Sequence, residues 1–510
     1  MGAAAGGIGA ANPGRGFSPA EWLADAVARL TLTHLLLLAM GLRLFALAVS
    51  TPIHSDEVFS YLETPHRLLF GEGVVTWEWR YGIRGWLLPL LVGAPMGLGG
   101  WIAPGTTLYL ILPKLVMTLV SLTTVMFAWR LGERVSRLHA QVAGFVATIW
   151  CEFILFAPHV LSDTASIACF LPAALILTDP AERRGGRLAL AAALLANAAA
   201  IRFQLGPAAV TLVAVTCLAR LRQTWAPLLI GGMLGLVPSA LADLAMGQTP
   251  FAWILENVRM NIVQHRAADW SASGPLGYFA EAWPRLTFWI VPLVALAAIG
   301  ARRFPALAWT AVVNFAAHSL IAHKEYRYIL LSVVIAVALA AVGAVDWATT
   351  QVPAEDRAAG RHRLGLVCLV WLLASLNCGL GGYRIEWGKW RPAMDLELSL
   401  QHDPALCGLA LYRHDFGFTG GYAYLHRPTP MFYYIDQDTT HPWSDFAGDT
   451  RMANTVLTRA SFRDEVPAAY AELRCEGSAA GRVCLYRRPG GCAPGPSPFA
   501  IQTVLRRLDQ

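Results

Sequence analysis

Acidic and aromatic side chains gather in the segment that follows the first long apolar stretch of the chain. Asp56 and Glu57 come directly after that stretch, and Trp77 and Trp79 flank Glu78 further on. A carboxylate beside apolar helix ends can have its pKa raised towards the range useful for a general base. Indole rings around an acid suit carbohydrate, because the rings stack on sugar C–H bonds while the acid accepts hydrogen bonds from hydroxyls. The segment predicts chemistry on a sugar; the alternatives are a helix cap at Asp56 and Glu57 and a belt of interfacial tryptophans.

A second polar cluster lies far along the chain, at the junction of two apolar stretches. It contains His323, Lys324, Glu325, Tyr326 and Arg327. Three potential cations and an acid within five positions could clamp a phosphate, with lysine as a point charge and arginine as a bidentate fork. A lipid phosphate would fit this cluster, and the alternative is simple anchoring to lipid headgroups.

Two further charged residues stand at junctions between apolar stretches. Asp163 begins one such stretch, where it would cap a helix and would join a site if the acidic segment lay nearby. Arg202 lies between two short apolar segments. An ionisable residue this close to the hydrocarbon indicates either an anionic partner or extension of the side chain to the headgroups.

The composition predicts a membrane protein. Of 510 residues, 55% are hydrophobic and 15% are charged, whereas a soluble domain carries about 25% charged residues. A span needs roughly 20 apolar residues. The windows near 163 and 188 are short, so tilted, broken or buried helices are expected there. The predicted spans are 31–50, 107–130, 140–157, 163–178, 188–201, 204–220, 226–243, 284–300, 305–322, 328–347 and 364–381.

Arginine-rich connections alternate along the chain, which predicts the orientation because basic residues are retained on the cytoplasmic side. The alternation holds only if the stretch 86–102 lies on the membrane surface. Residues 1–30 would then form a cytoplasmic tail, with 1–17 disordered. Residues 31–381 would form the membrane module, with a first outer loop at 51–106. The topogenic arginines are Arg130, Arg134, Arg137, Arg183, Arg184, Arg187, Arg220, Arg222, Arg302, Arg303, Arg361 and Arg363.

Residues 382–510 differ in character from the rest and predict a small mixed α/β domain outside the membrane. Charge rises there, and turn signals such as Thr419-Gly420-Gly421 separate strand-like runs such as 431–435. An even number of cysteines permits one or two disulfides, whose pairing the sequence leaves open. These cysteines are Cys407, Cys475, Cys484 and Cys492.

The motifs together resemble the signature of glycosyltransferase family 22, polytopic mannosyltransferases of the GT-C superfamily that build GPI-anchor and N-glycan precursors. The resemblance covers the membrane part and is weaker in the outer domain. It implies an α-helical GT-C fold of about eleven transmembrane helices, and the arginine-rich, lysine-poor composition suggests a bacterial member. The motifs that carry the resemblance are His54-Ser55-Asp56-Glu57, Glu63 with His66, Gly71-Glu72-Gly73, Thr76-Trp77-Glu78-Trp79, Ile83-Arg84 and His323-Lys324-Glu325-Tyr326-Arg327.

The resemblance implies an inverting transfer of a mannose-type sugar from a polyprenyl-phosphate donor to a glycan or glycolipid acceptor. Asp56 would be the base that takes the acceptor proton, with Glu57 as second candidate. The donor phosphate would be held by Arg202, His323, Lys324 and Arg327. The other residues expected to bind substrate are His54, Trp77, Glu78, Trp79, Arg84, Asp163, Glu325 and Tyr326, although the family often carries Asn where this chain has Asp163.

No cofactor is expected, because fixed cations can neutralise the phosphate, although a divalent ion would fit beside Asp56 and Asp163. The site would face the periplasm in a bacterium or the ER lumen in a eukaryote. The net charge of +6 is spread over loops, which argues against nucleic acid. The alternatives are a GT-C transferase of another sugar, such as aminoarabinose or a sugar moved to protein, and a transporter or flippase of lipid-linked sugar.

Overall fold

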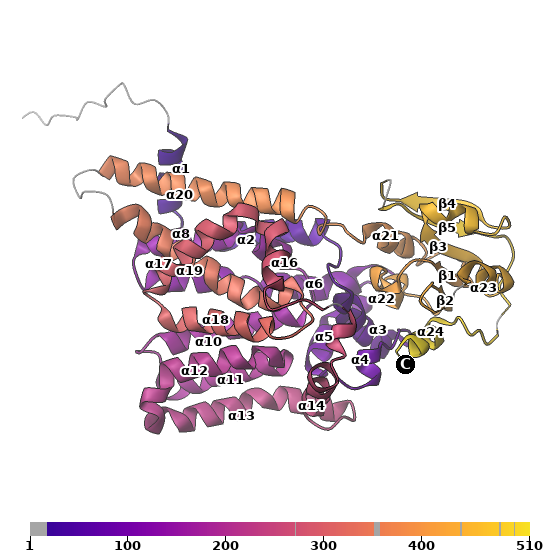
Figure 1. The fold of residues 1–510 in the computed structure, drawn as a ribbon, viewed down its shortest axis with the longest axis horizontal. Helices are drawn as coiled ribbons and strands as arrows, with labels where there is room; N and C mark the ends of the chain where they lie inside the picture. The colour runs from indigo at the N-terminus through magenta and orange to yellow at the C-terminus, as the bar shows by residue number, and fades with distance from the viewer. Residues whose placement is uncertain are drawn as a thin grey trace, which may run out of the picture.

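The structure, a computed structural model, describes residues 18–270, 272–350, 357–438, 441–478, 481–493 and 495–509. The prediction of disorder for residues 1–17 lies outside this part of the chain. Within the predicted cytoplasmic tail, α1 (Pro19–Ala28) is a helix that begins at the N-cap Ser18 and buries Ala20, Ala24 and Val27. It packs against α20 at one end of the helical block (Figure 1).

A block of long helices forms the larger part of the molecule (Figure 1). Helices occupy all eleven predicted windows, and six helical stretches among the described residues are long and apolar enough to cross a membrane. The helices of the block are α2 (Leu32–Val49), α6 (Leu108–Val120), α7 (Thr123–Glu133), α8 (Arg137–Ile149), α9 (Cys151–Leu155), α10 (Ser162–Thr178), α11 (Gly185–Ile201), α12 (Gly206–Cys217), α13 (Leu221–Ala245), α16 (Gly277–Leu286), α17 (Ile290–Ala301), α18 (Pro305–Ser319), α19 (Leu330–Thr350) and α20 (Arg357–Asn377).

Helix α19 lies at the centre of this block, and 83% of its most apolar stretch is buried. A helix that is apolar all round is expected to be surrounded by other helices, and α8, α17, α18 and α20 pack against α19. Its two ends carry different charges. Arg327 precedes its first residue, whereas Asp346 near its other end accepts two hydrogen bonds from Arg303 at 2.7 Å. At 1.5 Å per residue these two ends are roughly 30 Å apart.

Arg43 is fully buried inside the block and has only neutral partners among the hydrogen bonds of its side chain. It donates to Ser121 Oγ and Thr124 Oγ1 at 3.1 Å and to the carbonyl of Ala147 at 3.4 Å. Ser121 and Thr124 lie where α6 ends and α7 begins, so the guanidinium stabilises a break in this helical stretch.

Residues 51–106, which we call the first outer loop after the side predicted for them, are helical throughout most of their length and lie between the block and the carboxyl-terminal domain (Figure 1). Helix α3 ends at Gly71, whose φ of +89° suits a residue without a side chain. Trp79, Trp86 and Leu87 pack with Ala242 of α13, which fixes the loop to the block. The elements of this loop are the π-helical turn η1 (Glu57–Leu62), α3 (Glu63–Phe70), α4 (Trp77–Arg80) and α5 (Leu87–Ile102).

The carboxyl-terminal domain is a five-stranded mixed sheet with strand order β2-β1-β3-β5-β4. β1 is parallel to β2 and β3, whereas β5 is antiparallel to β3 and β4. Two disulfides join Cys407 to Cys492 and Cys475 to Cys484, which decides the pairing that the sequence left open. The elements are α21 (Arg391–Ser399), β1 (Leu409–Tyr412), α22 (Gly421–Leu425), β2 (Met431–Tyr434), α23 (Pro442–Gly448), β3 (Thr455–Arg459), β4 (Ala471–Glu476), β5 (Val483–Arg487) and α24 (Ile501–Leu508).

Short helix α22 joins this domain to the first outer loop. Glu63 of α3 is fully buried and accepts backbone N–H groups from Val74, Tyr422 and Ala423 at 2.7–3.1 Å. Gly421 has φ +59°, and a side chain at this position would lie 3.0 Å from the Glu63 carboxylate. Glu397 of α21 accepts the adjacent Gly420 N–H at 2.6 Å. We call Glu63, Glu397 and the Gly420–Ala423 turn the domain junction.

Candidate active site

A network of ion pairs, in which carboxylates alternate with guanidiniums, lies where the first outer loop meets the block. Asp56 Oδ2 lies 2.8 Å from Arg84 and 2.7 Å from Arg327. Arg84 also contacts Glu78 at 2.5 Å, while Arg327 contacts Asp163 at 2.9 Å. Segments far apart in sequence therefore meet within hydrogen-bond distance. The acid–arginine cluster consists of Asp56, Glu78, Arg84, Asp163, Arg202, Glu325 and Arg327.

Each member of the cluster stands at or beside a helix end, where the backbone turns and side chains can converge. Asp56 precedes the π-helical turn η1, a geometry often found at functional sites. Asp163 lies in the first turn of α10, and Arg202 follows the last residue of α11. Arg327 lies in the 3₁₀ turn η6 (Tyr326–Ile329) that leads into α19. The fixed ends of buried helices thus hold the charges in place.

Asp56 does not have the raised pKa that the sequence predicts. Burial alone would raise the pKa of this carboxyl, but the positive charges of Arg84 and Arg327 outweigh burial and hold the pKa below its ordinary value. Glu78, by contrast, has a raised pKa, because burial and the negative charge of Asp56 outweigh the attraction of Arg84. The expectation failed because it considered the apolar helix ends without the two arginines.

Glu325 contacts two histidines, His54 and His323. It lies 3.0 Å from His54 Nε2 and 2.8 Å from His323 Nε2, and it also contacts Arg327. Burial opposes ionisation, but Arg327 and the two imidazoles hold the pKa of Glu325 well below its ordinary range. His54, His323 and Glu325 therefore form the solvent-facing rim of the cluster, with side chains 18–27% exposed.

Arg202 and Arg327 are oriented by one aromatic ring. Their guanidinium carbons lie 4.6 Å and 4.9 Å from the centre of the Tyr328 ring. Arg202 also reaches Asp163 Oδ1 at 3.1 Å and Ser162 Oγ at 3.2 Å. Both arginines are only 5% exposed, so their charges act in a poorly hydrated setting.

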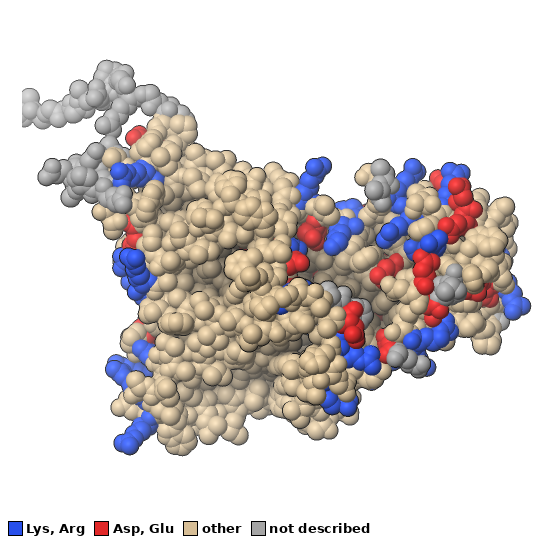
Figure 2. Space-filling view, viewed as in Figure 1, with Lys and Arg blue, Asp and Glu red and all other residues tan. Residues whose placement is uncertain are grey.

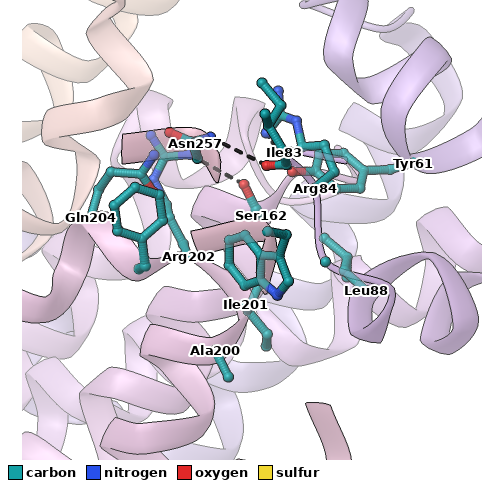
Figure 3. A pocket seen from close by; sticks show the side chains of 13 residues that line it. Tyr61, Ile83, Arg84, Leu88, Ser162, Ala200, Ile201, Arg202, Gln204 and Asn257 are labelled. Atoms are coloured by element: carbon teal, nitrogen blue, oxygen red, sulfur yellow. Dashed lines mark hydrogen bonds between the residues drawn. The ribbon is translucent and has the colours of Figure 1, made fainter. Parts of the chain in front are cut away.

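A small polar cavity opens beside the cluster between Arg84 and Arg202 (Figure 3). Trp253 and Asn257 of α14 (Ala252–Val258) line it, and Asn257 donates to the carbonyl of Ile83 at 3.2 Å. Trp253 Nε1 and Arg84 Nε are buried without a hydrogen-bond acceptor. Two unsatisfied donors at one cavity favour a ligand rich in acceptor oxygens.

Several predicted site residues lie outside the cluster. Lys324 donates to the backbone carbonyls of Ser273 and Ile321 at 3.2 Å and 2.6 Å. Tyr326 is buried and donates to Glu152, so it holds the η6 turn from behind. Lys324 and Tyr326 therefore stabilise the turn that carries Arg327.

Glu57, Trp77 and Trp79 also lie outside the acid–arginine cluster. Glu57 is fully buried, where its carboxylate accepts from Ile53 N and Val160 N and pairs with His159 Nδ1 at 2.8 Å. Burial opposes ionisation of this carboxyl, but His159 outweighs it and lowers the pKa. Trp79 packs against Trp86, with ring centres 4.6 Å apart, and Trp77 lies 6.5 Å from Tyr81. Neither indole lines the cavity beside Arg84.

Sequence reasoning missed Trp253, Asn257 and the role of Tyr328. The first two lie in a stretch between predicted spans that contains no charged cluster. The sequence indicates these residues only through their helical spacing. Trp253, Asn257 and Met260 fall on one face of a helix, which is buried, whereas Leu255 on the opposite face is exposed. Tyr328 directly follows the basic motif but offers no charge of its own.

The residues grouped like metal ligands lie in the carboxyl-terminal sheet, away from the acid–arginine cluster. Among the described residues, one group of three potential ligands has its atoms within 4.8 Å of one another, namely Glu472, Cys475 and Cys484. Its two cysteines form a disulfide, so this group is not a metal site.

The fold and this helix-end site define a multi-pass GT-C glycosyltransferase. The fold is similar to that of ArnT from Cupriavidus metallidurans bound to undecaprenyl phosphate, with TM-score 0.57, 13% identity, and coverage of 90% of this chain and 98% of that one. The sequence profile of the Alg9-like mannosyltransferase family matches residues 33–381, and the chain belongs to this family. It is therefore a mannosyltransferase and not a transporter, and the predicted resemblance is confirmed.

Curated relatives agree with this assignment. The chain is 28% identical over 440 residues to GPI mannosyltransferase 3 of Yarrowia lipolytica, covering 83% of this chain and 79% of that protein. It is 26% identical over 296 residues to GPI alpha-1,2-mannosyltransferase 3 of Danio rerio, covering 55% of this chain and 53% of that protein.

Proposed function

We propose that the protein transfers mannose from a polyprenyl phosphate to a hydroxyl group of a glycan or glycolipid, with inversion at the anomeric carbon. The observation that carries this proposal is the contact of Asp56 Oδ2 with both Arg84 and Arg327. A proton acceptor and cations for a leaving phosphate thus occur in one site. In a single displacement the sugar would lie between them, because the acceptor oxygen attacks the face of the anomeric carbon opposite the departing phosphate. ArnT, which shares the fold, is described as bound to undecaprenyl phosphate, a lipid carrier of the kind proposed here.

In the proposed step, Asp56 accepts the proton of the acceptor hydroxyl while its oxygen forms a bond to the anomeric carbon. The bond between that carbon and the phosphate oxygen breaks, and its electron pair stays on the phosphate. Arg84, Arg202 and Arg327 stabilise the charge that develops there. The donor is a phosphodiester with one negative charge, and it becomes a phosphate monoester that carries more, so fixed cations bind the product side of the step more strongly.

Binding of the donor would also prepare the base. Arg84 and Arg327 lower the pKa of Asp56 and make it a weak proton acceptor. A phosphate that recruits either guanidinium removes an ion pair from Asp56, and its proton affinity rises. The acceptor would then be activated only when the donor is present.

The predicted donor-binding residues have different parts in this proposal. Arg202 and Arg327 contact the phosphate, and Arg84 joins them. His323 acts through Glu325, and Lys324 reaches the phosphate only if it leaves its backbone partners. Glu57 holds the His159 turn against the first loop and so positions Asp56, its neighbour in the chain.

We also propose that the site faces the periplasm, or the ER lumen in a eukaryote. Its support is the length of α19, because Arg327 lies at one end and the Arg303–Asp346 pair at the other. Figure 2 shows Lys and Arg along the far end of the block, an uncharged middle, and the charged carboxyl-terminal domain opposite. Basic connections are retained in the cytoplasm, which supports an outward-facing cluster.

The test is transfer from synthetic polyprenyl-phosphate mannose to glycan and glycolipid acceptors by the purified enzyme and by Asp56→Asn. We expect the variant to keep donor binding and to lose about 10²–10⁴-fold in kcat, the usual contribution of a general base. A fully active Asp56→Asn enzyme would exclude Asp56 from this role.

We propose that no metal ion takes part, since the guanidiniums of Arg84, Arg202 and Arg327 would neutralise the phosphate. Turnover is expected to stay unchanged after treatment with EDTA and to be the same with added Mg²⁺ or Mn²⁺. Loss of activity on chelation, with recovery on addition of one metal, would instead favour an ion beside Asp56 and Asp163.

A further inference from the structure

A second concave site lies in the carboxyl-terminal domain, at the carboxyl ends of its three parallel strands. Arg413 directly follows β1, Asp436 follows β2 by two residues, and Glu465 ends the 3₁₀ segment η9 (Ala460–Glu465) that follows β3. The hollow has a volume of about 600 Å³, within the usual range for ligand pockets of roughly 300–1,000 Å³. Crevices outside the carboxyl ends of parallel strands are common places for ligands.

Arg413 is fixed at the floor of the hollow. Its guanidinium contacts Glu465 and Asp436 at 2.9 Å, and it stacks on Phe462 at 4.3 Å from the ring centre. Its backbone has φ +47°, an uncommon conformation for a residue with a side chain. Backbone strain of this kind is concentrated at functional sites, where the surrounding structure maintains it.

An indole ring stands at the rim. Trp443, on α23, is 54% exposed and lines the hollow together with Ser444 and Asp464. A large exposed aromatic ring beside fixed carboxylates and a guanidinium offers a stacking face and hydrogen-bond groups of both kinds. Sugars present matching C–H faces and hydroxyls.

The charges of the hollow argue against an anion and against a coordinated metal ion. Asp436, Asp464 and Glu465 outnumber Arg413, so a phosphate or other anion would be repelled. The three carboxylates are not among the described groups whose ligand atoms lie within 4.8 Å of one another, so they do not form a cage for a cation. A neutral polyol suits the mixed donors and acceptors of the hollow and the stacking face of Trp443.

We propose that this hollow binds a neutral oligosaccharide, the part of the acceptor glycan that is remote from the reacting hydroxyl. That the bound oligosaccharide is the acceptor of the reaction rests on the proposed function. Gly417 is the fourth residue after Arg413, which corresponds to at most about 14 Å of chain. A Cβ atom at Gly417 would lie 3.8 Å from Ser55, next to Asp56, and Phe416 packs against Phe59 with ring centres 4.7 Å apart. The end of β1 is thus joined to the loop beside Asp56, and an acceptor glycan long enough to reach both sites would use its remote binding energy to hold the reacting end in place.

The test measures binding of α-1,2-mannobiose to the full-length protein by saturation-transfer NMR without donor. We expect Trp443→Ala to weaken binding about tenfold and Trp443→Phe to restore most of it, because the phenyl ring retains a stacking face. Leu473→Ala, an exposed residue on β4, serves as the matched control and leaves the affinity unchanged. Equal affinity of wild type and Trp443→Ala would overturn the proposal.

Two further outcomes separate this proposal from its alternatives. If Ca²⁺ raises the melting temperature of wild type but not of Asp436→Asn, and mannobiose does not bind, the hollow is a cation site and the proposal is wrong. Because binding is measured without donor, failure of the transfer assay leaves this result unaffected. Binding lost in Trp443→Ala together with absent transfer would overturn the proposed function and keep the carbohydrate site.

Discussion

The acid–arginine cluster and the domain junction both bury carboxylates, but they neutralise them in opposite ways. Asp56 is surrounded by guanidiniums, and these hold its pKa below the ordinary value. Glu63 accepts three backbone N–H groups without an arginine in hydrogen-bond contact, and burial raises its pKa to about 7. Paired charges can exchange partners with an incoming phosphate, whereas a carboxylate bonded to backbone amides cannot leave without disrupting the fold. The first arrangement suits a reaction and the second suits an attachment.

The largest effect that would test this contrast is expected for Arg327→Ala. Removal of a guanidinium that contacts three carboxylates should lower kcat/KM by about 10²–10³-fold, comparable to the loss of one donor from an anion site. It should also raise the pKa of Asp56, because a neighbouring positive charge is lost. Steady-state kinetics over a pH series measures both.

The control for Arg327 is Arg43→Met, which removes another buried arginine from the same block. Its partners are neutral, so we expect a lower melting temperature and an unchanged kcat per folded molecule. If Arg43→Met reduced kcat as strongly as Arg327→Ala, the acid–arginine cluster would have no special role.

A smaller effect is expected for Trp253→Ala in the cavity beside Arg84. This indole presents an unpartnered N–H and packs on Gly85, so its removal should raise KM for the donor about tenfold with a smaller change in kcat. Trp101→Ala, on an exposed part of α5, is the control. Equal KM values for the two variants would remove α14 from the binding site.

The smallest effect on turnover is expected for Glu63→Gln in the domain junction. Because folding raises the pKa of this carboxyl from an ordinary 4.5 to about 7, its contribution to stability is complete below pH 4.5 and is lost as the pH rises through 7, by up to roughly 3 kcal/mol. The substituted amide cannot ionise, so the variant should lose less stability than wild type between pH 5 and 8, with kcat within about threefold. Melting curves across this range measure the difference, with Glu133→Gln on the surface as control; identical pH profiles of wild type and Glu63→Gln would contradict the assignment.

Local sequence predicted most of the elements, because hydrocarbon imposes a length and an apolar composition on every span. The run from Leu330 to Thr350 and the stretch from Leu32 to Val49 needed no tertiary information. The helices at 252–258 and 277–286 escaped prediction, since they are short and carry mixed polarity at the membrane boundary. The pairing of Cys407 with Cys492 could not be predicted either, because the two cysteines lie 85 positions apart in the sequence.

The sequence predicted which residues form the candidate site better than it predicted their contacts. Aspartates and arginines at helix ends facing one side of the membrane already predicted a phosphate and a base, and Asp56, Arg202 and Arg327 do meet. The direction of the Asp56 pKa was wrong, and Lys324 turned to backbone carbonyls instead of the cluster. Both depend on distances of a few ångströms between segments that are far apart in the chain.

Sequence by itself determined that this chain spans a membrane and that acids, arginines and histidines stand at the ends of its helices, because those properties follow from composition and local spacing. Only the tertiary structure decided which charges pair, since Coulomb interactions and desolvation depend on the separation and burial of groups that folding brings together. It also decided that Glu57 supports the site from behind, that Trp253 lines it, and that Arg413 is held at the ends of three parallel strands.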